Sequence, residues 1–208
     1  EGAGDLDVRA ARVDGAGGSA AGARLRLDQA RTTFSRDARG FGWRLDGPAT
    51  AVAVRASGAG LDGTGVSLSS SRLVLGGRNA AVEAEGPMAL SATRLVWGDL
   101  AFNGVRGGGR MDLVVDGGLR LAAASSLTAV RGAWPLFGPA SREDVPELAG
   151  MKQALSAFAV DIPAFSVTAG PSGARAALTR PATLRPANGV AHAQSSGGTD
   201  DHIGFWFR

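Results

Sequence analysis

The 208-residue chain has no cysteine and no tyrosine, and it has only one lysine and two histidines. Without cysteine there is no disulfide framework, no thiolate metal site and no cysteine nucleophile. The chain also lacks a run of about 18 apolar residues, which a membrane-spanning helix needs. We therefore predict no transmembrane segment. The first residue is Glu1 and no signal peptide follows, so we expect a processed chain or a piece of a longer one.

The net charge is small and aromatic side chains are few. The net charge is +3, and the arginines are dispersed along the chain rather than clustered, so we expect no nucleic-acid partner. Aromatic residues make up 6% of the chain, which leaves few large side chains to fill a closed, densely packed sandwich. An open, curved sheet with a thin apolar lining needs less filling.

Glycine is abundant, with 32 residues, and it separates short runs in which apolar and polar residues alternate. A period of two places alternate side chains on one face of a strand. The apolar sets are Leu25/Leu27, Trp43/Leu45, Val52/Val54, Val66/Leu68, Leu73/Leu75, Met88/Leu90/Ala92, Leu95/Trp97, Leu113/Val115 and Leu119/Leu121. Tight hairpin turns are predicted at Asp46-Gly47-Pro48, Asp62-Gly63, Gly76-Gly77, Asn103-Gly104 and Asp116-Gly117. The sequence predicts a mainly β fold, either an antiparallel meander or an open, curved β-sheet.

Part of this pattern forms an internal repeat, with one copy at residues 47–77 and the other at residues 86–118. The pairs Gly47-Pro48 and Gly86-Pro87 lie 39 positions apart, and Val66 matches Val105 at the same offset. Self-similarity at a fixed period is typical of units that stack on one another. We expect a single β-rich domain over residues 1–190, which acts as a surface or conduit rather than as a catalyst.

Charged residues occupy the positions between the apolar ones. We expect them on a solvated outer face, where charge discourages edge-to-edge aggregation. They are Arg24, Arg26, Arg44, Arg55, Arg72, Arg94, Arg110 and Arg120, with Asp28, Asp46, Glu83, Glu85 and Asp112.

One segment departs from the β pattern. Asp144 offers an N-cap acceptor, with Pro146 in the first turn and Glu147 three residues on. One apolar helix face is then formed by Leu148, Met151, Leu155 and Phe158. We predict an amphipathic helix over 145–159, which either caps one end of the sheet or serves as a lid or partner contact.

The C-terminal part is predicted to contain a hairpin and a tail. Residues 165–167 and 174–178 form a hairpin around Gly170-Pro171-Ser172-Gly173. Residues 191–208 are predicted to be a flexible tail because they are rich in polar residues, glycine and serine. The apolar end, 203–208, either forms a late strand or remains exposed.

Some segments resemble catalytic or binding motifs, but the neighbouring residues argue against these functions. Gly58-Ala59-Gly60-Leu61-Asp62-Gly63 matches a dinucleotide fingerprint, but a strand rather than a helix follows it. Arg106-Gly107-Gly108-Gly109-Arg110 occurs once and without aromatic residues, which favours a turn over an RNA-binding segment. The histidines, His192 and His202, lie in or beside the polar tail. We predict no catalytic residue, no metal site and no cofactor.

Bulky apolar residues are the remaining candidates for a site. They would be packing anchors in a closed core, whereas in an open groove they would line the site of an apolar ligand. The candidate lining residues are Trp43, Leu90, Trp97, Phe102, Leu113, Val115, Leu121, Trp134 and Phe137.

Three features of the sequence are reminiscent of one group of bacterial envelope proteins. They are the repeated Gly-Pro pairs, the run from Pro146-Glu147-Leu148-Ala149 to Val160-Asp161-Ile162-Pro163-Ala164-Phe165, and the closing segment from Arg180-Pro181 to Pro186-Ala187-Asn188-Gly189. Residues 47–189 resemble the AsmA-like proteins, which include the TamB and YdbH relatives. The resemblance implies long β-sheets folded into a taco-shaped groove that carries or shields lipid acyl chains between the two membranes.

We therefore expect a non-enzymatic, β-rich domain of the bacterial periplasm or cell envelope. It would bind or conduct lipid acyl chains for envelope and outer-membrane maintenance, with lipid or other envelope proteins as partners. The alternative is a structural or adhesive β-domain of a surface protein, with a closed sandwich or solenoid and an exposed strand edge. A β-helical carbohydrate-active enzyme would require clustered carboxylates on one sheet face.

Overall fold

The computed structural model describes residues 2–15, 18–37, 40–58, 60–79, 81–116, 118–135, 138–170, 173–186, 191–195 and 203–207. The strands are β1 (Gly2–Gly15), β2 (Gly18–Asp37), β3 (Gly40–Gly58), β4 (Leu61–Arg78), β5 (Ala81–Trp97), β6 (Leu100–Val115), β7 (Leu119–Ala133), β8 (Phe158–Gly170), β9 (Gly173–Leu178), β10 (Ala182–Pro186), β11 (Ala191–Ser195) and β12 (Ile203–Phe207). The helix is α1 (Pro146–Ser156), between β7 and β8.

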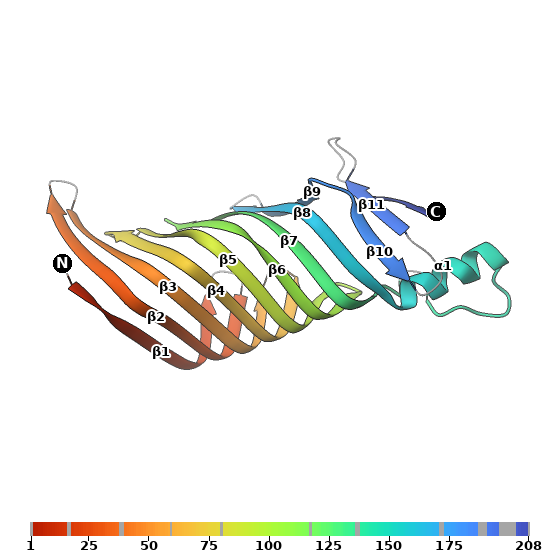
Figure 1. The fold of residues 1–208 in the computed structure, drawn as a ribbon, viewed down its shortest axis with the longest axis horizontal. Coiled ribbons are helices and arrows are strands. Elements are labelled where there is room, and N and C mark those ends of the chain that lie inside the picture. The colour runs from red at the N-terminus through yellow and green to blue at the C-terminus, as the bar shows by residue number, and fades with distance from the viewer. Residues whose placement is uncertain are drawn as a thin grey trace.

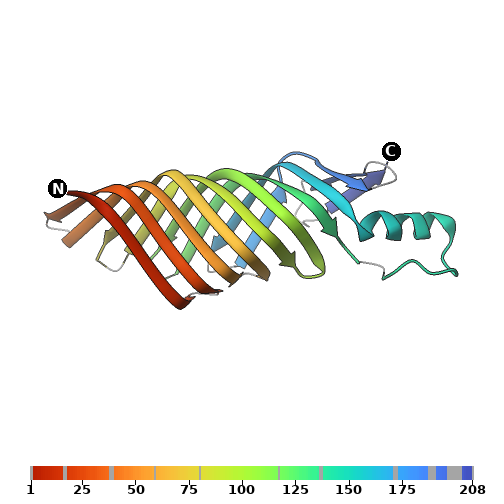
Figure 2. The ribbon, with the colours of Figure 1, turned by 60° about the horizontal axis from the view of Figure 1, so that its bottom comes forward.

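The strands form one antiparallel sheet in chain order. Strands β1 to β8 follow one another, β10, β11 and β12 continue the sheet, and β9 pairs with β8. The N-terminus lies at one end of the sheet and α1 at the other (Figure 1). The strands are bent, so the sheet curls about its long axis and remains open (Figure 2). The predicted open antiparallel meander with one short helix is confirmed.

One row of residues from β2 to β7 crosses the sheet without cross-strand partners. We call it the bend row; it consists of Gly22, Val54, Gly65, Thr93, Gly104 and Val130 from β2 to β7. The neighbouring residues are paired and the bend-row residues are not: the pairs Ala53–Val66 and Arg55–Thr64, for example, enclose Val54 and Gly65. The three glycines have φ of +60°, +56° and +61°, which only glycine adopts without strain.

The bend row also changes the alternation of side chains. In β6, Phe102 and Val105 lie three residues apart and yet pack in the same hydrophobic cluster. Regular strand pleating would place residues three apart on opposite faces. Gly104 is one extra residue in the alternation, and it keeps the apolar residues on one face along the whole strand.

The 39-residue repeat is a unit of two strands. Leu61 and Leu100 begin β4 and β6, and Gly65 and Gly104 occupy the bend row in these two strands. Each repeat therefore adds one hairpin to the sheet and one glycine to the bend row.

Most of the predicted turns lie inside strands. Only Asp116-Gly117 falls between two strands, whereas Asp46-Gly47-Pro48, Asp62-Gly63, Gly76-Gly77 and Asn103-Gly104 belong to β3, β4 and β6. At Gly47 the register between β3 and β4 shifts, which is a β-bulge. The prediction of short strands was wrong because these glycines serve bulges, bends and close strand contacts rather than reversals.

The glycines at 107–109 are also part of a strand, not a turn. A Cβ atom on Gly107 would come within 2.6 Å of the Ser126 carbonyl oxygen, and one on Gly109 would overlap the backbone at Ala124. Both glycines lie in β6, beside β7. Their small size permits close contact between these strands.

The helix is shorter than the predicted span of 145–159. It begins at Pro146 and ends at Ser156, so Phe158 belongs to β8. The N-cap is Val145, which makes no side-chain cap hydrogen bond. The predicted capping role of Asp144 was wrong because its carboxylate binds the Lys152 ammonium group, with N–O distances of 2.8 and 3.0 Å.

The C-terminal segment differs from the predicted flexible tail in its backbone pairing. Within residues 191–208, β11 pairs with β10 and with β12. The late strand, one of the two forms expected for the apolar end, is the form that the structure has. The hairpin of β8 and β9 contains the segments 165–167 and 174–178, as predicted.

Candidate functional site: an apolar trough

Rows of paired residues give the sheet one apolar face. One row crosses eight strands through successive pairs, and every member is apolar: Val8, Leu25, Ala51, Leu68, Leu90, Gly107, Leu127 and Ile162. A second row joins Leu45, Leu75, Ala84, Leu113 and Leu121. Between the row through Trp43 and the row through Trp97, the paired positions of this face carry no charged side chain. We call this surface the apolar face.

The apolar face is the inner side of the bent sheet. Leu27 is 0% exposed and Val105 is 1% exposed, although no second sheet is described that could cover them. In a single layer, side chains reach such burial only where curvature presses neighbours of the same face together. Val66 shows this directly, because a Cβ on Gly63 of the same strand would lie 2.6 Å from its Cγ2 atom. The apolar face therefore lines a trough.

The trough is open to solvent. Most lining residues are half-buried, and the largest exposed apolar side chains stand at the two rims. Phe34 is 66% exposed at one rim and stacks on Phe41 with 5.8 Å between ring centroids. Trp97 is 48% exposed at the other rim.

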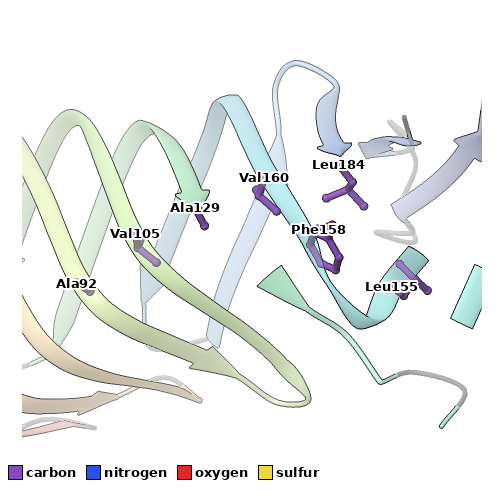
Figure 3. Close-up of a cluster of buried hydrophobic side chains, with 7 residues drawn as sticks. All are labelled: Ala92, Val105, Ala129, Leu155, Phe158, Val160 and Leu184. Atoms are coloured by element: carbon purple, nitrogen blue, oxygen red, sulfur yellow. The ribbon is translucent and has the colours of Figure 1, made fainter. Parts of the chain in front are cut away.

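One end of the trough holds the larger of the two buried clusters (Figure 3). It consists of Ala92, Val105, Ala129, Leu155, Phe158, Val160 and Leu184. Phe158 begins β8 immediately after α1, and its ring lies against Gly132 of β7. Leu155 is the one buried residue of α1, while Leu148 and Met151 are half-buried. The helix thus anchors on this end of the sheet through Leu155.

The predicted lining residues that belong to strands lie on the apolar face, whereas Trp134 follows the end of β7. Trp43 and Val115 are in the row at one rim, Leu113 and Leu121 are in the next row, and Leu90 is near the middle. Phe102 and Trp134 pack against the buried cluster. Trp97 forms the opposite rim, and Phe137 lies outside the described residues.

The list of candidate lining residues was incomplete. It omits Leu25, Leu45, Leu68, Leu75 and Met88, which the alternation had grouped among the apolar sets and which share the apolar face. In β3 the face is formed by Ala49, Ala51 and Ala53, so grouping Val52 and Val54 with the core residues was wrong. Both sets alternate with period two, and only the cross-strand partners show which set faces inward. The pairing of Ala51 with Leu25 and Leu68 shows that the alanines, and not Val52 and Val54, belong to the apolar face.

The opposite, polar face carries charges in ion pairs between strands. Arg72 binds the Asp46 carboxylate from β4 with an N–O distance of 2.6 Å, and this hydrogen bond lowers the pKa of Asp46. Arg24 binds Asp7 at 2.7 Å; its hydrogen bond, with a second one from Arg9, lowers the pKa of Asp7 to about 2. These pairs are exposed, so each contributes little to stability. They keep charge on the outside of the bend.

Within the residues that the structure describes, no three His, Cys, Asp or Glu side chains are grouped to hold a metal ion. The glycine motif at 58–63 joins β3 to β4, two strands, and so has no helix N-terminus for a pyrophosphate. Two shallow hollows of 410 and 570 Å³ lie outside the trough centre, one beside the bulge at Asp5 and Gln29 and one along the bend row.

In comparisons with known proteins, no family model, no curated sequence and no solved structure matches this chain. The one helix of the described part has 11 residues, and no helix there is long and apolar enough to cross a membrane.

Proposed function

We propose that this chain is a non-enzymatic domain of the bacterial cell envelope that binds lipid acyl chains in its trough. The observation that carries the proposal is the uncharged apolar face, which continues across eight strands and remains partly exposed. Apolar surface of this extent is uncommon on monomeric proteins and usually marks a binding site. A periplasmic location, as expected from the sequence resemblance, would place such a trough between the two membranes.

The dimensions of the trough suit an extended apolar chain. Eight strands spaced about 4.8 Å apart extend over about 34 Å. One leaflet contributes about half of the ~30 Å hydrocarbon core of a bilayer, so one acyl chain reaches about 15 Å. The trough is therefore long enough to shield an entire acyl chain, and its uncharged lining imposes no directed polar contact on it. Movement of a chain along the rows would exchange similar apolar contacts, which favours conduction.

The alternative, a structural or adhesive domain, predicts a closed sandwich or solenoid. The described sheet is a single open layer, which favours the lipid proposal. For a carbohydrate-active enzyme, carboxylates would have to cluster on one sheet face. Several acidic residues of the polar face instead form separate ion pairs with arginines, such as Asp46 with Arg72.

Lipid binding can be tested on the purified chain with one pair of variants. Leu90 and Ser91 are neighbours in β5; Leu90 is half-buried on the apolar face and Ser91 is exposed on the polar face. We expect a fluorescent fatty acid to bind the wild-type chain, and Leu90→Asp to weaken binding at least tenfold because the ligand must then contact a charge. The matched variant Ser91→Asp should bind as the wild type does.

Circular dichroism of both variants checks that the sheet is retained. Extraction and mass spectrometry of co-purified lipid provides a second readout that needs no added probe. Absence of both co-purified lipid and fatty-acid binding in the folded wild-type chain would contradict the proposal. Equal binding by the two variants would place the ligand elsewhere.

A further inference from the structure

Arginines gather on the polar face beside the bend row, although they are dispersed along the sequence. On one side of the bend row, cross-strand pairs join arginines on every second strand from β1 to β7, namely Arg12, Arg55, Arg94 and Arg131. On the other side, a second row of pairs joins Arg9, Arg24 and Arg106 through Val52, Ser67 and Ser91. From β1 to β7, neither row contains an acidic residue. We call these two rows, with the bend row between them, the arginine strip.

The internal repeat contributes to the regular spacing of the strip. Arg55 and Arg94 are 39 positions apart, which is the period of the repeat, and each repeat adds two strands. These arginines therefore fall in the same row, about 9.6 Å from each other. Across the six strand spacings from β1 to β7 the strip extends over about 29 Å.

More than half of the arginines in the strip have no described counterion. Arg12 binds Asp14 with an N–O distance of 2.8 Å, and Arg9 and Arg24 share the Asp7 carboxylate. The other four are exposed and form no ion pair with a described carboxylate; they are Arg55, Arg94, Arg106 and Arg131. The strip therefore carries an excess of positive charge.

The excess is local to the strip. Asp62 on β4 and Asp161 on β8 adjoin it, but neither forms a described ion pair with it. Further along the same strands, another row of the polar face has the opposite character, with Arg31, Asp46, Val74, Glu85 and Asp112. The two faces of the sheet thus differ in polarity, and the polar face itself differs in charge from one part to another.

Apolar side chains lie exposed between the two rows of arginines. Val54 is 65% exposed and Val130 is 78% exposed, both in the bend row. The hollow along the bend row is bordered by Val52, Val54 and Thr93. A partner of the strip therefore meets fixed positive charges on both sides of a narrow apolar line.

We propose that the arginine strip binds the surface of a membrane that contains anionic phospholipids. Guanidinium groups donate paired hydrogen bonds to phosphate oxygens, and each basic residue near an anionic membrane adds to the attraction. A membrane presents phosphates along the whole length of about 29 Å, and the exposed valines suit the boundary between headgroups and acyl chains. Because the strip lies on the polar face, this contact leaves the apolar face uncovered.

Two other anionic partners fit the strip less well. Single-stranded nucleic acid stacks its bases on aromatic side chains, and neither row of the strip nor the bend row contains one. A second copy of the chain would offer the acidic row, but there Asp46 already binds Arg72 and Glu85 already binds Arg110.

The test is flotation of the full chain with vesicles of phosphatidylcholine alone, or of equal parts of phosphatidylcholine and phosphatidylglycerol. We expect binding to the phosphatidylglycerol vesicles at about 0.1 M NaCl and its loss at about 0.5 M NaCl, where salt screens exposed charges. Vesicles of phosphatidylcholine alone should bind little. The triple variant Arg55→Gln/Arg94→Gln/Arg131→Gln should bind at least about tenfold more weakly than the wild type.

The matched control removes the same charge from exposed positions of the polar face outside the strip. It is the triple variant Arg44→Gln/Arg110→Gln/Arg120→Gln, and it should bind much as the wild type does. Circular dichroism checks that both variants retain the sheet.

Four results would overturn the proposal. They are unchanged vesicle binding by the variant of the strip, equal loss in both triple variants, and binding to neutral vesicles as tight as to anionic ones. The fourth is a different partner that the variant of the strip loses: either an oligonucleotide bound more tightly than the vesicles, or a dimer seen by light scattering. Fatty-acid binding in the trough is measured without vesicles, so failure of either proposal is recognised separately.

Discussion

At the scale of single residues, the glycines of the bend row hold positive φ where β2, β4 and β6 lack cross-strand pairs. Gly65 has φ of +56°, and the Thr93 side chain packs directly on its Cα. Holding a branched residue at positive φ costs on the order of 1–3 kcal/mol, before any clash is counted. We expect Gly65→Val to lower the free energy of unfolding by at least this amount in urea denaturation. Gly150→Ala is the control: Gly150 is an exposed helical glycine without close neighbours, and alanine there should stabilise by about 0.5–1 kcal/mol. Equal effects of the two substitutions would refute the role of positive φ.

The ion pair of Asp144 and Lys152 is the least exposed one described, with side chains 9% and 11% exposed. The hydrogen bond from Lys152, joined by one from the Ser141 backbone N–H, lowers the pKa of Asp144. Since the folded-state pKa lies below the unfolded value of about 4, the stabilisation is complete above about pH 4 and is lost as pH falls through the lowered pKa.

This pair gives a second prediction. In urea denaturation, wild-type stability should decline below about pH 4 more than that of Asp144→Asn does. At pH 7, Lys152→Met should be more destabilised than Asp144→Asn, because it leaves the Asp144 carboxylate without its cation. The double variant, Asp144→Asn with Lys152→Met, should recover part of the loss. An additive double variant would contradict coupling of the two side chains.

At the scale of elements, the sequence predicts strands well and their lengths poorly. Alternation over Leu73/Leu75 and over Met88/Leu90/Ala92 correctly places these residues on one face. Asn103-Gly104 was mistaken for a turn because glycine at positive φ serves a hairpin and a bend equally well. The distinction depends on whether the flanking residues pair with each other or with neighbouring strands, and this is set by contacts distant in sequence. The predicted end of the helix was wrong for a similar reason, because Phe158 has helical spacing in the sequence but pairs with Gly132 of β7.

The junction between α1 and β8 should be a main source of local stability. Phe158 is 4% exposed and packs among Leu155, Val160 and Leu184. We expect Phe158→Ala to lower the free energy of unfolding by about 3–5 kcal/mol, as for other buried phenylalanines. Phe34→Ala removes the same ring from a site that is 66% exposed, and should cost about 1 kcal/mol or less. Similar losses for both would show that the cluster is not a packed core.

At the scale of the whole molecule, the trough follows from a sheet that bends without closing. The scarcity of aromatics favoured an open, curved sheet, while the sequence left a groove and a closed core as alternatives for the bulky apolar residues. Which residues line it could not be predicted completely. Ala51 and Val52 both fit an alternating pattern, and only the cross-strand rows distinguish them.

In the proposed function, acyl chains lie in the trough and not on the outer face. Because the chain contains no cysteine, single cysteines can be introduced at Leu90 and at Ser91 and each can be tagged with a photoreactive group. We expect cross-linking of an added fatty acid from position 90 and little or none from position 91, with competition by unlabelled fatty acid at position 90. Equal cross-linking from both positions, or cross-linking from position 91 alone, would contradict it.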